Sequence, residues 1–204
     1  MTEINCFLQK RWERTFPGEI EEFQIIQAKY SEPHRYYHTL KHVYDCIRLL
    51  DSLTVEISRI EVETALWFHD VVYDPKRKDN EHASAEFFKS HRVSAIFDTE
   101  FRQRICRMIE NTACHLSDQS IDESIMIDID LSILGSSFEK YNEYAELIRL
   151  EYSFVDDDTY RNGRKKVLES FLSREFIYST PPFRQTHEKN ARNNILSEIK
   201  TLSP

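Results

Sequence analysis

Apolar residues recur along most of the chain at the spacing of an amphipathic helix, in which one face packs on a core and the other meets water. Two stripes show this pattern clearly, and each of them includes a histidine. The first stripe consists of His42, Cys46, Leu49, Leu50 and Leu53, and the second of Val62, Ala65, Leu66, His69 and Val72. The chain is therefore expected to be largely helical.

The same spacing predicts a succession of helices separated by short breaks. Pro17 and Gly18 separate the first two helices, Asp79 is the expected cap of a later one, and an acidic turn at residues 156–158 caps the second last. The predicted helices cover residues 3–15 and 19–31, a third helix beginning near Tyr37, and then residues 56–73, 79–92, 98–115, 137–155, 158–174 and 186–202.

The segment SIMIDIDLSILG at residues 124–135 fits two interpretations. Its apolar residues alternate as in a strand, and they also fit helical spacing. A lone strand would have no partner among helices, so this segment is predicted to be helical. No internal repeat, linker or low-complexity tract interrupts the pattern. The predicted fold is a single all-α domain, a helical bundle over residues 1–204.

Composition agrees with this fold. The 204 residues include three glycines and six prolines, a balance that favours helices over a turn-rich β fold. The length suits one domain and is sufficient to bury a substantial core.

Charge and hydropathy narrow the classes of partner. A formal net charge of -8 argues against nonspecific binding to nucleic acid or to an anionic membrane surface, since both depend on clustered positive charge. No run of about eighteen apolar residues is present, and the first residues are too charged for a signal sequence. The four cysteines show no CxxC spacing and are expected to be reduced. A cytoplasmic protein without membrane association is expected.

His69 and Asp70 stand side by side in the apolar and aromatic run ALWFHDVVYD, residues 65–74. Burying two ionisable side chains costs several kcal/mol unless each finds a partner. His42 and an aspartate within IDIDLS are also expected to point to the apolar side of their helices. Imidazole and carboxylate groups are ligands for Mn, Fe, Co, Ni and Zn, and Mg is a further option. A divalent metal ion is therefore the predicted partner.

Two aspartates compete for the last ligand position. Asp128 and Asp130 are two residues apart, so they point in nearly opposite directions on a helix and only one can face the metal. Asp130 shares the stripe of Ile127, Leu131 and Leu134, which favours it as the ligand. Asp128 is then expected to lie behind the ligands or to face solvent.

Several neighbours of these positions carry side chains that could act beside a bound metal. His38 precedes His42 by four residues, so on one helix face it would stand beside the metal, unless it is only a helix cap or a surface histidine. Arg35, three residues before His38, could hold an anion through its guanidinium, and Lys76 lies on a basic loop that could line the pocket or simply be solvated. Glu81, in the first turn of a helix, could orient a water or accept its proton, or merely interact with the helix dipole.

Through the order of these residues along the chain, the sequence resembles the HD superfamily of metal-dependent phosphohydrolases. The residues His42, His69 with Asp70, and Asp130 repeat the H…HD…D signature of that superfamily. YHTLKH at residues 37–42 resembles the YHNxxH element of its cyclic-nucleotide phosphodiesterase branch. Nearly the whole chain resembles a family of small bacterial predicted HD-domain phosphohydrolases, through RYYHTLKH, ALWFHDVVYD, DNEHASAEF, DIDLSILG, IRLEY and NGR in this order.

The resemblance implies an all-helical HD fold with a metal at its centre. His42, His69, Asp70 and Asp130 match the metal ligands, and His38 matches the histidine that donates a proton to the leaving oxygen. Arg149 and Arg164 match residues typical of the family, although either could pair with Glu151 or another carboxylate. Some HD enzymes use two extra histidines for a second metal. His115 is one candidate here, and His82 could be the other or could simply be an exposed residue of its helix.

The implied activity is hydrolysis of a nucleotide or another small phosphoester by a metal-activated water. Asp70 would hold the ion and the water, with His38 and Glu81 as further catalytic residues and Arg35, Lys76 and Arg149 as substrate-binding residues. The sequence has no glycine-rich P-loop that would suggest consumption of ATP. Two alternatives stay open: an HD-fold dinuclear-iron oxygenase, and a nucleotide-sensing HD module without turnover.

Overall fold

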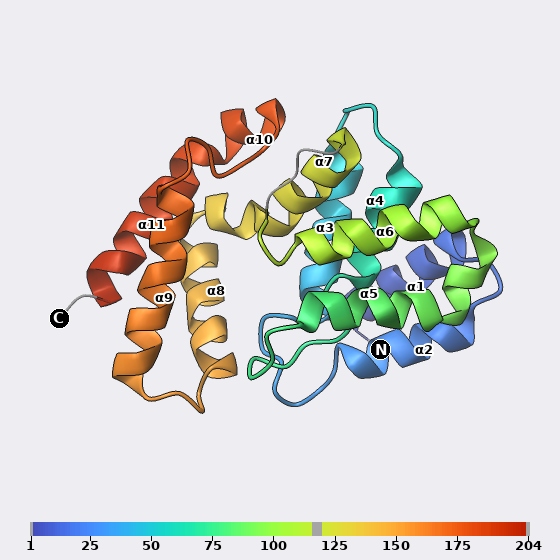
Figure 1. Cartoon of the computed structure of the whole chain (residues 1–204), viewed down its shortest axis with the longest axis horizontal. Coiled ribbons are helices and arrows are strands. Elements are labelled where there is room, and N and C mark those ends of the chain that lie inside the picture. The colour runs from blue at the N-terminus through green and yellow to red at the C-terminus, as the bar shows by residue number, and fades with distance from the viewer. Residues whose placement is uncertain (1, 116–119, 203–204) are drawn as a thin grey trace. The chain divides into compact units, whose positions relative to one another are not determined.

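The computed structural model describes residues 2–115 and 120–202. All regular secondary structure in these two ranges is helical, which confirms the predicted all-α fold and the helical interpretation of residues 124–135. Two short 3₁₀ helices are η1 (Arg92–Ile96) and η2 (Leu131–Gly135). The α-helices, labelled in Figure 1, are α1 (Glu3–Thr15), α2 (Ile20–Lys29), α3 (Leu40–Ser52), α4 (Arg59–Phe68), α5 (Asn80–Ser90), α6 (Thr99–Asn111), α7 (Ile121–Asp130), α8 (Phe138–Glu151), α9 (Asp157–Leu172), α10 (Pro181–Thr186) and α11 (Glu188–Leu202).

The chain divides into two compact units, Met1–Met126 and Ile127–Pro204, and the boundary lies within α7. The prediction of one domain over residues 1–204 stays a prediction, because the compactness of each unit does not measure whether the two unfold together.

The first unit is built around α4. Every residue from Glu61 to Phe68 is buried, so α4 beyond its first two residues is enclosed on all sides, as expected for a helix at the centre of a core. It contacts α3, α5 and α6, and α5 runs beside α6 (Figure 1). The indole rings of Trp12 and Trp67 meet edge to face, with centroids 5.2 Å apart. This packing fixes the carboxyl end of α4, where His69 and Asp70 follow.

A buried ion pair joins α1 to α4. Arg11 donates from Nε and Nη2 to the two carboxylate oxygens of Glu63, each at 2.7 Å, and from Nη1 to Asp51 at 3.1 Å. The Arg11 and Glu63 side chains are both nearly enclosed. Removing one partner of such a pair leaves an uncompensated buried charge and costs about 3–5 kcal/mol. The pair therefore fixes how α1 lies on α4.

In the second unit α11 packs along α9 and also contacts α8, α10 and η2 (Figure 1). The Asn194 side chain on α11 donates to the carbonyl oxygens of Leu134 and Ser136, at 2.9 and 3.0 Å, and so satisfies backbone groups at the end of η2. The largest enclosed side chains of this unit are Tyr141, Tyr178 and Phe183.

The short helix α10 was not expected from the sequence. Asp128 accepts hydrogen bonds from the amides of Ser179 and Thr180, both at 2.7 Å, and from the Thr180 hydroxyl at 2.6 Å. Pro181 then begins the helix, a position that suits its fixed φ angle. Asp128 is fully buried, so of the two positions expected for it the one facing solvent is wrong. Burial raises its pKa to about 6, although the hydrogen bonds from Thr180 and Ser179 act in the opposite direction.

Among the predicted helix boundaries that are wrong, two matter for the site. The third helix begins at Leu40 instead of near Tyr37, because Thr39 adopts an extended backbone and its hydroxyl accepts a hydrogen bond from the Lys41 amide. His38 therefore lies in a turn before the helix. The fourth helix ends at Phe68 instead of reaching residue 73.

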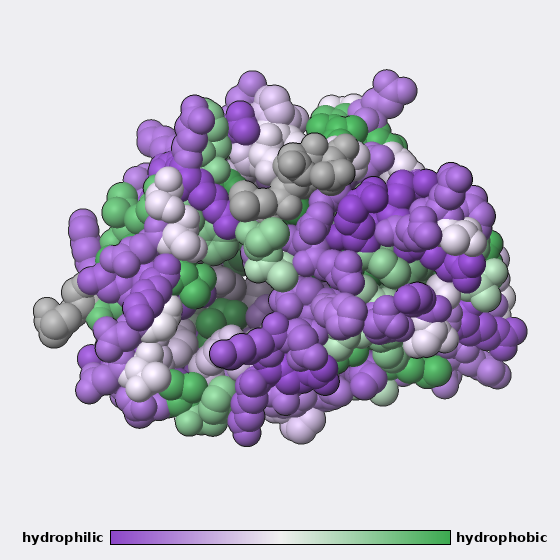
Figure 2. Space-filling model, in the orientation of Figure 1, coloured by the Kyte–Doolittle hydropathy of each residue, from purple (hydrophilic) through white to green (hydrophobic). Residues whose placement is uncertain are grey.

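The surface is predominantly hydrophilic in the face shown in Figure 2, with smaller hydrophobic areas between hydrophilic ones. Among the described residues, no helix combines the length and apolar character needed to cross a bilayer.

Candidate metal site

The candidate site begins where α4 stops. His69 still closes the helix through its amide, which donates to the Ala65 carbonyl oxygen at 2.9 Å. Beyond His69, side chains form hydrogen bonds with the backbone groups that would pair with one another if the helix continued. Arg35 binds the carbonyl oxygens of Asp70 and Val71, and the Ser84 hydroxyl exchanges hydrogen bonds with the amide and carbonyl of Val72. These partners explain the early helix end.

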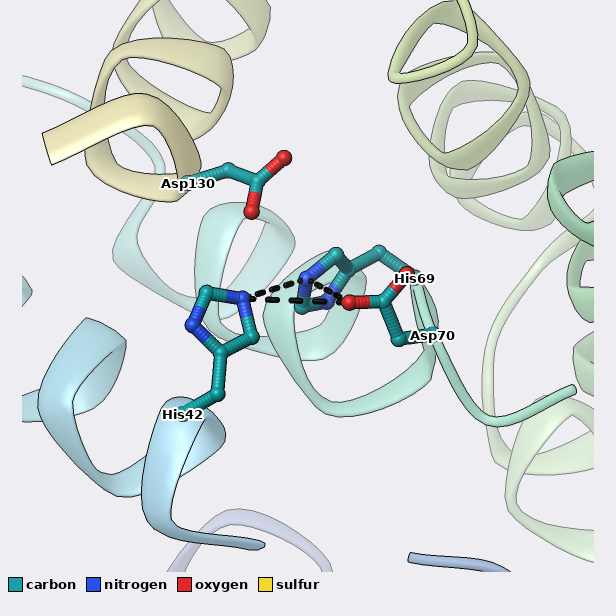
Figure 3. A group of neighbouring side chains, drawn as sticks. All are labelled: His42, His69, Asp70 and Asp130. Carbon is teal, nitrogen blue, oxygen red and sulfur yellow. Dashed lines mark hydrogen bonds and ion pairs between the residues drawn. The ribbon is translucent and has the colours of Figure 1, made fainter. Parts of the chain in front are cut away.

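Three side chains of the first unit converge at this point (Figure 3). His42 comes from the first turn of α3, and His69 and Asp70 from the turn after α4. The Nε2 atoms of His42 and His69 are 3.1 Å apart. The Oδ2 atom of Asp70 lies 3.0 Å from Nε2 of His69 and 3.8 Å from Nε2 of His42. Both imidazoles are buried, at 5 % and 1 % exposure.

The tautomer of His69 is set by the backbone. Its Nδ1 atom lies 3.0 Å from the Leu66 carbonyl oxygen, which can only accept, so Nδ1 carries the proton. In a neutral ring Nε2 then presents a lone pair, and this lone pair faces the Asp70 carboxylate, which is also an acceptor. Two acceptors at this distance repel unless a proton or a cation lies between them. A carbonyl partner on the far nitrogen is typical of histidines that bind metals.

Asp130 completes the group. It is the last residue of α7, a helix that starts in the first unit and continues without a break. One ligand atom from each of His42, His69, Asp70 and Asp130 lies within 4.8 Å of every other. In the described ranges this is the one group of three or more histidines, cysteines or acids with such spacing. The four side chains proposed from the sequence are thus brought together, pointing toward one another in Figure 3.

The donor set fits a divalent transition metal. Two ligand atoms about 2.1 Å from one ion, at angles of about 90–110°, are roughly 3.0–3.4 Å apart. The separation of 3.1 Å between the two Nε2 atoms falls in this range. Two imidazole nitrogens with carboxylate oxygens suit Mn, Fe, Co, Ni or Zn. This group of histidines and aspartates could hold one metal ion.

Tyr30 lies behind the site as a neutral phenol. Burial raises its pKa well above the ordinary value, the Asp70 carboxylate raises it further, and Arg35 lowers it. Its hydroxyl donates to the Trp67 carbonyl oxygen at 3.1 Å. Tyr30 is therefore a structural hydrogen-bond donor at physiological pH.

His38 lies close to His42 for a different reason from the one expected. The two do not share a helix face, because α3 begins after His38. Instead, the His38 ring stacks on Tyr73, with centroids 4.1 Å apart, and its centroid lies 6.2 Å from that of His42. His38 is half-buried. Stacking on Tyr73 thus holds a titratable ring beside the candidate ligands.

The predicted substrate-binding residues occupy varied environments. Lys76 is exposed, and its amide binds the Asp74 carboxylate. Arg149, in the second unit, binds the carbonyl oxygens of Tyr152 and Val155 and the Asp157 carboxylate, so it joins the end of α8 to the start of α9. Pairing with a carboxylate is the alternative role expected from the sequence for Arg149, and Asp157 is that carboxylate.

Arg35 has a buried guanidinium occupied by protein acceptors. A phosphate contact by Arg35 would have to displace them. Nothing in the sequence indicated that its acceptors would be backbone carbonyls.

The remaining candidates do not join the group of ligands. Glu81 is half-buried in the first turn of α5. His82 is exposed and lies 3.1 Å from the Glu110 carboxylate. His115 follows α6 with a positive φ of 50°. Neither histidine belongs to the group that could hold a metal.

No protein-family model, no curated protein and no solved structure matches the chain.

Proposed function

We propose that this protein is a metal-dependent phosphohydrolase that acts on a nucleotide or another small phosphoester. The observation that carries the proposal is the convergence of His42 Nε2, His69 Nε2 and Asp70 Oδ2, with the His69 tautomer held by the Leu66 carbonyl. The order of these residues along the chain, with Asp130, resembles the HD signature and supports hydrolysis over other uses of a metal.

In this proposal His42, His69, Asp70 and Asp130 hold one divalent cation. When bound, such an ion lowers the pKa of a coordinated water and polarises a phosphoryl oxygen. Asp70 also has a second role, because its partly exposed carboxylate can orient the attacking water. The two enclosed imidazoles exclude bulk water from one side of the site, which strengthens every electrostatic interaction there.

Hydrolysis forms a bond between the water oxygen and phosphorus and breaks the bond between phosphorus and the ester oxygen. The departing alkoxide takes the electron pair of that bond and needs a proton. His38 is the proposed donor, since its ring is held beside His42 by Tyr73. Glu81 or Asp70 is the proposed acceptor of the proton that the water loses.

A phosphorylated substrate needs positive charge in this acidic protein. Lys76 is exposed on the loop between α4 and α5, from which a flexible ammonium could reach an anionic substrate bound beside Asp70. The choice of a nucleotide or small phosphoester rests on the resemblance to HD phosphohydrolases.

The test begins with the metal content of the purified protein, followed by a screen of nucleoside monophosphates, diphosphates and cyclic phosphates with Mn²⁺, Co²⁺, Zn²⁺ and Mg²⁺. Asp70→Ala should lose the metal and lower phosphate release on the order of a thousandfold, equivalent to about 4 kcal/mol. Asp45→Ala is the matched control, because Asp45 is an exposed carboxylate on α3 that pairs with Lys41.

Retained metal and activity in Asp70→Ala would contradict the proposal. Two iron ions per chain with oxygen uptake and no phosphate release would favour the oxygenase instead. Nucleotide binding without hydrolysis, in protein loaded with metal, would favour the sensing module.

A further inference from the structure

Arg35 connects two segments that are far apart in sequence. From the segment before α3, its Nη1 atom donates to the carbonyl oxygens of His38, at 3.1 Å, and of Asp70, at 2.6 Å. Its Nη2 atom donates to the carbonyl oxygen of Val71 at 3.0 Å. Its Nε atom donates to Glu32 at 3.0 Å, and its side chain has no exposed area.

Aromatic rings enclose the same guanidinium. The Arg35 Cζ atom lies 5.1 Å from the centroid of the Tyr30 ring and 5.5 Å from that of Tyr73, within the range of cation–π attraction. The Tyr73 ring stacks in turn on His38. Arg35 thus touches the backbone of both His38 and Asp70 and the ring that supports the His38 imidazole.

We infer that Arg35 is a positioning residue that holds the turn carrying Asp70 and the segment carrying His38 in one fixed arrangement. Backbone hydrogen bonds from one rigid, planar group fix the two carbonyls relative to each other, and so restrict where both side chains can point. If the proposed function holds, this arrangement places the proton donor beside the metal ligands. Arg35 acts through those residues, because its guanidinium is bound to a carboxylate and to backbone carbonyls of the protein.

Lysine cannot reproduce this geometry. Its ammonium is a single point on a flexible stem, whereas the guanidinium donates from three nitrogens in a plane. Arg35→Lys keeps the charge and loses the simultaneous contacts with Asp70, Val71 and His38. Removing partners that orient metal ligands typically weakens metal affinity about 10–100-fold. We expect a loss of at least about tenfold for this variant.

The matched control is Arg11→Lys. Arg11 is a second nearly enclosed arginine of the first unit, and its acceptors are the carboxylates of Glu63 and Asp51. Both substitutions disturb a buried guanidinium, so both should lower the free energy of unfolding. Only Arg35→Lys should weaken Co²⁺ binding, measured by competition with a chelator, while Arg11→Lys should stay within about threefold of wild type.

Amide hydrogen exchange of the metal-free proteins gives a second measurement that does not depend on hydrolysis or on metal binding. Arg35→Lys should speed exchange in residues 36–39 and in residues 70–73 together, while Arg11→Lys leaves both segments at the wild-type rate. If Arg35→Lys does not fold, Glu32→Gln replaces it, because this change removes the carboxylate that anchors Nε at a partly exposed position.

Wild-type exchange in either segment of a folded Arg35→Lys protein would overturn the inference. So would unchanged Co²⁺ affinity in a chain whose wild type binds Co²⁺. A wild type that binds metal and hydrolyses nothing would refute the proposed function alone, and both measurements on Arg35 would still decide its role.

Discussion

The Nε2 atom of His42 lies 3.1 Å from the Nε2 atom of His69, although the two histidines belong to different helical segments. Because the Leu66 carbonyl holds the proton of His69 on Nδ1, the facing nitrogen of the neutral ring is an acceptor. The Asp70 carboxylate adds further acceptor oxygens on the same side. This convergence of acceptors is the physical basis for the candidate metal site.

Metal should stabilise the folded protein through this pair. A ligand that binds only the native state adds about 2.7 kcal/mol to the free energy of unfolding at a hundred times its Kd. Urea unfolding with and without Co²⁺ should show this gain for wild type and none for His69→Ala. His82→Ala is the control, since His82 lies outside the group, and it should keep the full gain. A gain of equal size in His69→Ala would place the metal elsewhere.

The role of His38 can be separated from metal binding. His38→Gln should retain the metal, because His38 is not among the four grouped residues. For substrates with poor leaving groups kcat/KM should fall about 10²–10⁴-fold, the usual contribution of a general acid, while substrates with good leaving groups should lose less than about tenfold. Equal losses for both kinds of substrate would exclude His38 as the proton donor.

Two glycines of the second unit should respond oppositely to alanine. At Gly135 a Cβ atom would lie 2.6 Å from Cβ and 2.7 Å from the backbone oxygen of His187, so Gly135→Ala should lower the free energy of unfolding by about 1–3 kcal/mol. At Gly163, exposed within α9, nothing lies within 4 Å of the added atom, so Gly163→Ala should raise it by about 0.5–1 kcal/mol. Urea denaturation measures both values, and a stabilised Gly135→Ala would show that the contact with His187 is wrong.

Acid should destabilise the second unit through His187. Burial against Tyr178 and Phe183 lowers the His187 pKa below its ordinary value of 6.5. As the pH falls below 6.5, His187 is protonated in the unfolded chain before it is protonated in the folded chain. The free energy of unfolding therefore decreases as the pH falls from 6.5 toward the lower pKa of the folded state. His187→Gln should show a shallower decline in unfolding free energy between pH 7.5 and 5.5. An identical decline in both proteins would contradict the lowered pKa.

Much of the fold could be predicted because apolar spacing reports helices directly. The helical nature of residues 124–135 followed from the lack of a partner strand, and it is confirmed. The positions of helix ends were harder to predict, because they depend on side chains that are distant in the sequence. The carbonyls beyond Phe68 bind Arg35, which lies more than thirty residues earlier in the sequence. No pattern in the sequence near Phe68 predicts such a partner.

The candidate site likewise has some residues that could be predicted from the sequence and others that depend on tertiary structure. His42, His69, Asp70 and Asp130 could be singled out because ionisable groups in apolar runs need partners. The use of Asp128 could not be predicted, since the amides of Ser179 and Thr180 approach it through folding of the second unit. Arg35 was expected to bind phosphate because of its charge, and its carbonyl acceptors depend on tertiary structure alone.

The most direct test of the metal site is anomalous X-ray diffraction from crystals of the protein prepared with Co²⁺. We predict one anomalous peak about 2.0–2.2 Å from Nε2 of His42, Nε2 of His69 and carboxylate oxygens of Asp70 and Asp130. Crystals grown with excess Co²⁺ that show no peak among these four side chains would contradict it.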